Sequence, residues 1–207
     1  MRAFIYTGGT VFTEYLSERP EKEDLIIAAD AGYLTMKKLG FPPHIMLGDF
    51  DSLGSFDAPE GVEIIRVPAE KNDTDTQLAV KTALERGARE LVIVGGMDGR
   101  ADHTLSTLAI LEDLQTKRVR ALLTNGKNRA RFLRDDGALI PKEHFRYLSL
   151  IAADLKVKGV TLQGCKYPLK NATLSRLNQY AVSNEIEGNC ALVEIRRGGV
   201  WVIESMD

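Results

Sequence analysis

The stretch IMLGDFDS at residues 45–52 joins a short apolar run to a pair of aspartates. The run Ile45–Leu47 has the composition of a buried strand. Asp49 and Asp51 follow it directly, one on each side of an aromatic residue, as a chelate-like pair of carboxylates. We therefore expect a strand that delivers two carboxylates to one edge of a sheet, where open α/β sheets bind their ligands.

The same arrangement recurs on both sides of this stretch, since short apolar runs alternate with segments of helical periodicity over the first 125 residues. Strands are expected at residues 3–6, 25–29, 45–47, 62–67, 90–94 and 119–124, and helices at residues 11–18, 32–39, 74–86 and 103–115. The alternation predicts βαβ units and a mostly parallel sheet flanked by helices. The helix at 74–86 has the strongest local signal, because Thr74 and Gln77 fit a capping box.

The pattern changes after about residue 130, where helical periodicity fades. Short runs rich in β-branched or aromatic residues predict strands at residues 138–140, 147–151, 155–157, 160–162, 191–195 and 200–203, separated by turn residues such as Gly159. These runs predict a small all-β sandwich or roll. The first 125 residues carry an acidic excess and the remainder a basic excess. We therefore expect two domains, an α/β domain at residues 1–128 and a β-sandwich at residues 129–207.

Overall composition excludes several classes of partner. The formal net charge is −2, which gives no electrostatic reason to expect nucleic acid or an anionic membrane. No apolar run approaches the roughly 18 residues that a membrane-spanning helix needs. The apolar stretch within Met1–Gly9 is too short for a secretory signal. Cys165 and Cys190 are far apart and fit the reduced thiols of a cytoplasmic protein.

Carboxylates follow several of the expected strands. These aspartates are Asp30, Asp49, Asp51, Asp75 and Asp102. The carboxyl ends of parallel strands share one edge, and carboxylates gathered there repel one another unless a cation joins them. Mg²⁺ is the expected cation, because it takes oxygen ligands and shares itself with nucleotide phosphates. Taken singly, Asp75 could be a helix-capping charge and Asp30 a turn residue, but their shared edge favours a joint site.

Paired glycines indicate where phosphates could bind beside the expected metal site. Gly8-Gly9 follows the first strand and Gly95-Gly96 follows the strand at 90–94. Glycine lets backbone N–H groups approach phosphate oxygens closely, and the helix that follows favours negative charge. The chain has neither a Gly-x-x-x-x-Gly-Lys-Ser/Thr loop nor a Gly-x-Gly-x-x-Gly fingerprint, so Walker-type and dinucleotide-binding folds are not indicated.

At these residues the chain resembles the thiamin pyrophosphokinase family over nearly its whole length. Two family motifs are matched in full, Gly-Asp-Phe-Asp-Ser at 48–52 and Gly-Gly-x-x-Gly-Arg-x-Asp-His at 95–103. Two others are matched with one departure each: Ala31 replaces Gly in an Asp-Gly-Gly-like element, and Asn72 replaces Asp in an acidic-Lys-Asp-x-Thr-Asp element. In the second half, residues 159–161, 164–169 and 183–185 match family elements, as does Trp201.

The resemblance implies a nucleotide-binding α/β domain and a thiamine-binding β-sandwich. It implies transfer of diphosphate from ATP to the hydroxyl of thiamine, giving thiamine diphosphate and AMP, in a homodimer that holds thiamine between its subunits. The residues expected around ATP are Gly8, Gly9, Asp30, Gly32, Lys71, Gly95, Gly96 and His103. The residues expected around thiamine are Ser183 and Asn184, as hydrogen-bonding groups, and Trp201, as a stacking surface or as a core residue.

For the reaction, we expect the substrate hydroxyl to attack the β-phosphorus while AMP leaves. Asp49, Asp51 and Asp75 are assigned to Mg²⁺, directly or through water. Lys71 and Arg100 are expected to steady the phosphates. Asp102 is expected either to orient the substrate or to accept the hydroxyl proton, and the sequence does not separate these roles.

Two other functions compete with this one. The Asp-x-Asp pair at 49–51 also resembles the start of haloacid-dehalogenase-type phosphatases, but that class places the motif after its first strand, and here two expected strands precede it. A non-catalytic sensor of nucleotide or thiamine diphosphate is the second alternative. The full acidic set argues against it, because binding alone needs fewer carboxylates.

Overall fold

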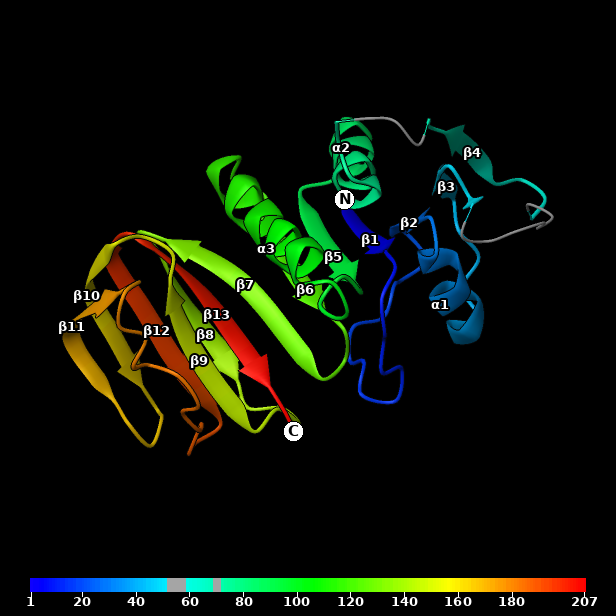
Figure 1. The fold of residues 1–207 in the computed structure, drawn as a ribbon. Helices are drawn as coiled ribbons and strands as arrows, with labels where there is room; N and C mark the ends of the chain where they lie inside the picture. Colours follow the sequence, from blue (N-terminus) through cyan, green and yellow to red (C-terminus); the bar gives the residue numbers. More distant parts are fainter. Residues whose placement is uncertain (52–58, 69–71) are drawn as a thin grey trace.

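The computed structural model describes residues 1–51, 59–68 and 72–207 of the chain. The described elements form two sheets, a large one that carries helices on both faces at one end and a smaller one that packs on its other end (Figure 1). The helices of the described residues all lie within residues 1–125, which we call the first half of the chain, and residues 126–207 are the second half. In the described ranges, no helix combines the length and the apolar character needed to cross a bilayer.

The first half alternates strands with helices. In chain order its elements are β1 (Arg2–Tyr6), β2 (Leu25–Ala29), α1 (Gly32–Leu39), β3 (Ile45–Gly48), β4 (Glu63–Arg66), α2 (Asp75–Glu85), β5 (Glu90–Val94), α3 (Ala101–Thr116) and β6 (Arg120–Thr124). The second half consists of strands. They are β7 (Asn128–Arg134), β8 (Gly137–Pro141), β9 (Tyr147–Ala152), β10 (Lys156–Gln163), β11 (Leu169–Ser175), β12 (Cys190–Arg197) and β13 (Gly199–Ser205).

The large sheet has the strand order β4-β3-β2-β1-β5-β6-β7-β13-β9. The six strands of the first half pair in parallel, and the chain starts at β1 in their middle. It runs outward to β4 and then returns to the other side of β1 with β5. Loops after β1 and its two neighbours therefore meet at one edge, which is the position where such sheets bind ligands.

Helices cover the two faces of the parallel part. Met36 of α1 packs with Phe4 and Tyr6 of β1 on one face. On the other face, α2 and α3 pack against the sheet around Ile5, with Ala79 and Leu111 among the buried side chains. The parallel strands are thus buried on both sides, which explains why their sequences are nearly continuous apolar runs.

The smaller sheet, in the order β11-β10-β12-β8, is antiparallel and packs on the β7-β13-β9 end of the large sheet. Buried side chains from both sheets fill the space between them, including Leu150, Val193 and Val202. The predicted fold class, a parallel α/β sheet with helices plus a β-sandwich, is confirmed. Strands β7, β13 and β9 form one layer of the sandwich and also continue the large sheet. The sheet is therefore not interrupted at residues 128 and 129, and the domain boundary there stays a prediction.

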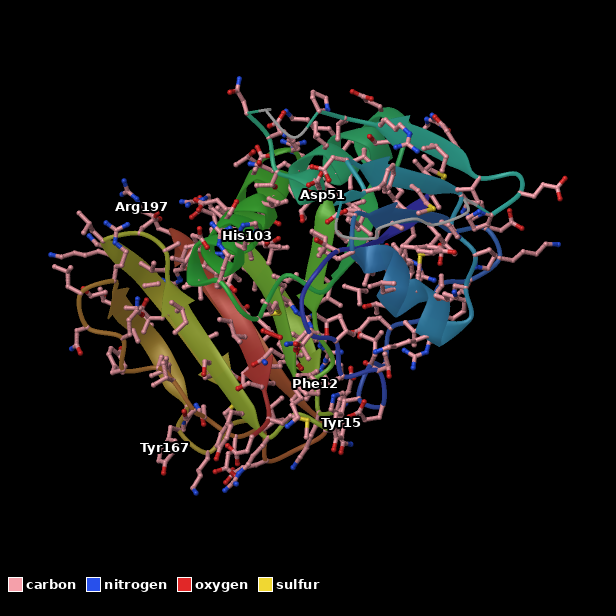
Figure 2. All side chains as sticks on the ribbon, turned by 45° about the vertical axis from the view of Figure 1, so that its right-hand side comes forward. Phe12, Tyr15, Asp51, His103, Tyr167 and Arg197 are labelled. Carbon is pink, nitrogen blue, oxygen red and sulfur yellow. The ribbon has the colours of Figure 1, made fainter. Side chains whose placement is uncertain are left out.

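The prediction of a helix at residues 11–18 is wrong, because the segment forms turns and irregular structure. Leu16 of this segment packs in the core beside Phe4, whereas the rings of Phe12 and Tyr15 contact Lys127 (Figure 2). The Phe12 N–H donates to the carbonyl of Asn125 (2.8 Å), and the Lys127 ammonium lies 5.1 Å from the centre of the Phe12 ring and 6.0 Å from that of Tyr15. Tertiary contacts therefore decide the conformation of this segment.

Three features of the second half also differ from expectation. Gly159 does not separate two strands, since β10 runs through it with a shift of register, and its φ of +68° marks a bulge. Strands β7 and β11 were not predicted. Arginines in β7 obscure its alternation of apolar and polar residues, although Arg129 is buried. Strand β11 lies at the edge of the smaller sheet, and most of its side chains are exposed or half-buried.

The capping box of α2 is formed as predicted. The Thr74 hydroxyl accepts from the Gln77 N–H (3.2 Å), and the Gln77 side chain accepts from the Thr74 N–H (2.8 Å). We expect Thr74→Ala to lower the free energy of unfolding by about 1 kcal/mol, because the half-buried first turn of α2 loses its cap. Urea unfolding measures this, with Thr74→Ser as the control that retains the hydroxyl. Equal losses in both variants would contradict the capping role.

Candidate active site

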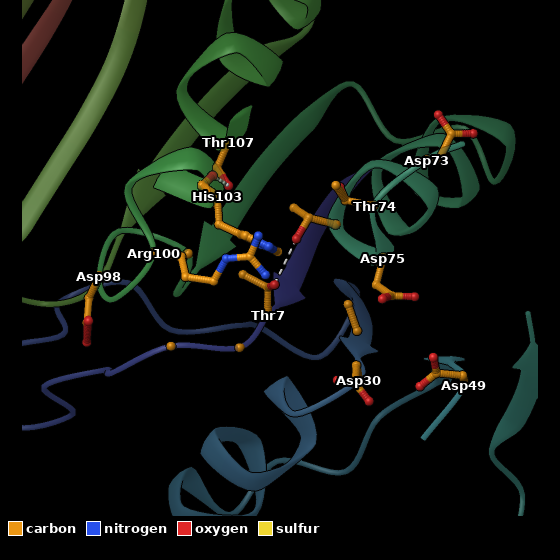
Figure 3. Close-up of a pocket in the computed structure, with 15 residues that line it drawn as sticks. Thr7, Asp30, Asp49, Asp73, Thr74, Asp75, Asp98, Arg100, His103 and Thr107 are labelled. Atoms are coloured by element: carbon orange, nitrogen blue, oxygen red, sulfur yellow. Dashed lines mark hydrogen bonds between the residues drawn. The ribbon is translucent and has the colours of Figure 1, made fainter. Parts of the chain in front are cut away.

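A pocket of about 480 Å³ lies at the carboxyl edge of the parallel strands (Figure 3). It is bordered by the loops after β1, β2, β3 and β5 and by the first turns of α2 and α3. The lining residues are Thr7, Gly8, Gly9, Ala29, Asp30, Asp49, Asp73, Thr74, Asp75, Thr76, Gly96, Asp98, Arg100, His103 and Thr107. Segments that are far apart in the sequence thus meet at the predicted edge.

Asp30 and Asp49 line one side of this pocket, and Asp51, which does not line it, lies close to both of them. Oxygens of Asp30, Asp49 and Asp51 all lie within 4.8 Å of one another. The strand pairing explains the approach, because β2 and β3 are parallel neighbours and the Asp30 N–H donates to the carbonyl of Leu47 (2.8 Å). Gly48 lies at this approach: a Cβ there would stand 3.3 Å from Cα and Cβ of Asp30. Carboxylates at such spacing favour a shared cation.

The turn at residues 49–51 aims its two aspartates by burying the residue between them. Phe50 is 4% exposed and has a φ of +62°, an uncommon conformation for a bulky side chain. Its ring packs in the core with the residues under α1, and the Arg66 guanidinium lies 5.4 Å from the ring centre. The Asp51 N–H donates to an Asp49 oxygen (3.2 Å). Burial of Phe50 thus turns Asp49 and Asp51 outward.

The donor set fits Mg²⁺. The ion takes hard oxygen ligands, keeps several waters and is usually bound by one or two carboxylates together with substrate phosphates. Of the expected ligands, the structure brings Asp49 and Asp51 together, with Asp30 as the third member. Asp75 lines the same pocket but is not part of this closely spaced group. Figure 3 shows Asp30, Asp49 and Asp75 around the same end of the pocket.

The paired glycines bring two loops into contact. The Gly96 N–H donates to the Gly8 carbonyl (2.9 Å), and a Cβ at Gly95 would stand 2.5 Å from the carbonyl oxygen of Thr7. Gly95 also has a φ of +105°. The close approach therefore requires glycine at 95. Gly8, Gly9 and Gly96 line the pocket, whereas Gly95 supports it from behind.

Threonines at the base of the pocket were missed by the sequence reasoning. The hydroxyls of Thr7 and Thr76 are 2.8 Å apart and join the end of β1 to the first turn of α2 (Figure 3). Thr107 is 4% exposed, and its hydroxyl donates to the carbonyl of His103 (2.8 Å). The only sequence signal was that Thr7 directly precedes Gly8, which is too general to identify a site.

Arg100 and Asp102 form an ion pair at the mouth of the pocket. The Arg100 Nε donates to an Asp102 oxygen (3.1 Å), and its Nη2 contacts the other oxygen. This hydrogen-bonded guanidinium holds the pKa of Asp102 below its usual range. A lowered pKa makes the carboxylate a weaker proton acceptor. Arg100 and His103 line the pocket, whereas Asp102 does not, so its link to the site runs through Arg100.

Two further expected residues have other placements. Gly32 is buried in the first turn of α1 and does not line the pocket; a Cβ there would stand 2.0 Å from the Tyr6 carbonyl oxygen, which indicates packing against β1. Lys71 lies outside the described residues.

The residues expected at thiamine lie in the second half, and none of them lines this pocket. Asn184 is 5% exposed, and its side chain both accepts from and donates to the backbone of Tyr167 (3.0 and 2.7 Å). It shares a small cavity with Tyr167, which is 61% exposed. Ser183 is exposed, and its N–H donates to the hydroxyl of Ser149 (3.0 Å). The Trp201 indole donates to the carbonyl of Leu108 in α3 (3.1 Å), and its half-buried ring packs against the core.

Comparison with known proteins gives a consistent result. The family model of the thiamin pyrophosphokinase catalytic domain matches residues 16–123, and the model of the vitamin B1 binding domain of the same enzymes matches residues 138–199. A thiamine pyrophosphokinase of Bacillus subtilis is 29% identical over 194 residues, which cover 90% of each chain.

Solved structures agree with the sequence matches. A thiamine pyrophosphokinase from Bacillus subtilis superposes with a TM-score of 0.88 at 27% identity, and a thiamin pyrophosphokinase family protein from Enterococcus faecalis with a TM-score of 0.87 at 30% identity. In both cases the match covers all of this chain and all of the other. The similarity therefore includes both the pocket and the sandwich.

Proposed function

The chain belongs to the thiamin pyrophosphokinase family, and from this we infer that the pocket at the carboxyl edge binds ATP with Mg²⁺ and is the place of reaction. The protein is a diphosphotransferase, and the activity of its family is transfer of diphosphate from ATP to thiamine. The observation that carries the assignment is the group Asp30, Asp49 and Asp51, whose oxygens lie within 4.8 Å of one another at a pocket that two glycine loops also line.

The two sides of the pocket have different tasks in this proposal. Asp30, Asp49 and Asp51 would hold the metal, with Asp75 reaching it directly or through water. Bound Mg²⁺ neutralises part of the phosphate charge. At the other side, backbone N–H groups near Gly8 and Gly96 and the first turns of α2 and α3 favour the phosphates, because helix N-termini carry partial positive charge.

The reaction joins the thiamine hydroxyl oxygen to the β-phosphorus and breaks the bond from that phosphorus to the oxygen bridging to the α-phosphate. AMP leaves with the bridging oxygen, and the hydroxyl proton is released to solvent. Arg100, which lines the pocket, is placed to contact the phosphates and steady the group in transfer. Because Asp102 pairs with Arg100 and its pKa is lowered, we assign it to orientation of this guanidinium and not to proton transfer.

The thiamine site is proposed to need a second copy of the chain. Ser183, Asn184 and Trp201 do not line the acidic pocket of their own chain. A homodimer in which each sandwich approaches the pocket of the other copy would bring thiamine to the β-phosphate. Tyr167, which is exposed and whose backbone is bonded to Asn184, offers an aromatic surface for a planar cation in that arrangement.

The direct test is release of AMP from ATP by the purified protein. We expect release that requires both thiamine and Mg²⁺, and that falls to background with excess EDTA and returns with added Mg²⁺. Alcohols related to thiamine serve as controls for the acceptor. A trapped aspartyl-phosphate would support the phosphatase alternative. Tight binding of ATP or thiamine without turnover would support the sensor alternative, and either result would overturn the proposal.

A further inference from the structure

Two loops lie side by side at the glycine side of the pocket. Residues 7–10 leave β1, and residues 95–100 leave β5. Their contact extends the pairing of the two strands, through the Thr7 N–H on the Val94 carbonyl (2.9 Å) and the Gly96 N–H on the Gly8 carbonyl (2.9 Å). Beyond these bonds the first loop contains Gly9, whose φ is +103°. Because glycine has many accessible conformations, the loop needs a further contact to hold one of them.

A side chain supplies this constraint. The Asp98 carboxylate accepts a hydrogen bond from the backbone N–H of Thr10 (3.0 Å) and so holds the far end of the first loop. Asp98 is half-buried and lines the pocket, at the opposite end from Asp30, Asp49 and Asp75 (Figure 3). It is not one of the closely spaced carboxylates. The motif at 95–103 leaves this position unspecified, so the family pattern gives Asp98 no role.

We propose that Asp98 is a positioning residue that fixes the loop at residues 8–10 in the shape that receives the nucleotide phosphates. The inference rests on the proposed function of the pocket. Flexible glycines lose much conformational freedom when a ligand orders them, and this loss weakens binding. A loop already held by Asp98 loses less on binding. The effect acts on the nucleotide and not on thiamine, which the other half of the chain is proposed to hold.

The test compares two substitutions at one position. Asp98→Ala removes the acceptor, and we expect KM for ATP to rise about tenfold, as for loss of one hydrogen bond, with KM for thiamine unchanged. Asp98→Asn retains an acceptor oxygen, and we expect KM for ATP within about twofold of the parent. Asp113→Ala is the matched control, because Asp113 pairs with Lys117 at the far end of α3. Equal KM increases in the alanine and asparagine variants would overturn the proposal, since charge and not loop position would then matter.

Hydrogen exchange separates this inference from the proposed function. In the absence of nucleotide, the Thr10 amide should exchange faster in Asp98→Ala than in the parent, and at the parent rate in Asp98→Asn and Asp113→Ala. Unchanged exchange in Asp98→Ala would overturn the positioning role even if the protein is an active kinase. Failure of the parent itself to bind ATP would instead overturn the function of the pocket.

Discussion

Replacing Asp49 by asparagine is expected to lower kcat on the order of 10³-fold, equivalent to about 4 kcal/mol of transition-state stabilisation. The Asp49 carboxylate lies between the other two members of the acidic group in sequence and lines the pocket with Asp30. An amide keeps the shape but removes a charge, so Mg²⁺ binds less tightly and neutralises less phosphate charge. Asparagine retains an oxygen that can accept from the Asp51 N–H, so the fold should stay intact.

Thiamine-dependent AMP release over a range of Mg²⁺ concentrations measures this effect. Asp73→Asn is a suitable control, because Asp73 lines the same pocket but its carboxylate is paired with Lys81 (2.6 Å) and lies outside the closely spaced group. We expect this control to retain kcat within about threefold, as for an exposed ion pair. Near-normal turnover of Asp49→Asn at saturating Mg²⁺ would remove Asp49 from the metal site.

Local sequence signals predict the parallel half of the fold well, because strands buried on both faces leave uninterrupted apolar runs. Strand β5, for example, was expected at 90–94 and is observed there. The segment at 11–18 forms no helix despite its local pattern, since Phe12 and Tyr15 form contacts with residues more than a hundred positions away. Strand β7 was missed because Arg129 is buried by pairing with Glu204 (2.7 Å), which only the tertiary structure reveals.

The acidic edge of the site was predictable because strand order in a parallel sheet converts spacing in sequence into proximity in space. Asp49 and Asp51 meet as expected, but the addition of Asp30 depends on the pairing of β2 with β3 and on the close approach at Gly48. Sequence alone could not distinguish a glycine that lines the pocket from one that packs on a strand. Gly96 lines the pocket, whereas Gly32 does not.

Gly32→Ala is expected to lower the free energy of unfolding by about 3 kcal/mol or more, because an added methyl group would overlap the backbone of β1. The new Cβ would stand 2.0 Å from the Tyr6 carbonyl oxygen and 2.7 Å from the Thr7 nitrogen. Helix propensity alone predicts the opposite sign, since alanine stabilises a helix relative to glycine by roughly 0.5–1 kcal/mol. The overlap outweighs this gain, because it involves backbone atoms of a central strand and no flexible side chain can yield.

Gly40→Ala provides the matched control at the other end of the same helix. Gly40 has a φ of +76°, but a Cβ there would have no neighbour within 4 Å. Only the left-handed conformation is penalised, so we expect a loss of roughly 1–2 kcal/mol. Urea unfolding at one fixed protein concentration compares the two variants with the parent. A smaller loss for Gly32→Ala than for Gly40→Ala would show that α1 shifts away from β1 at little cost. In that case the end of β1, and with it the start of the pocket at Thr7, is not held in place by contact with α1.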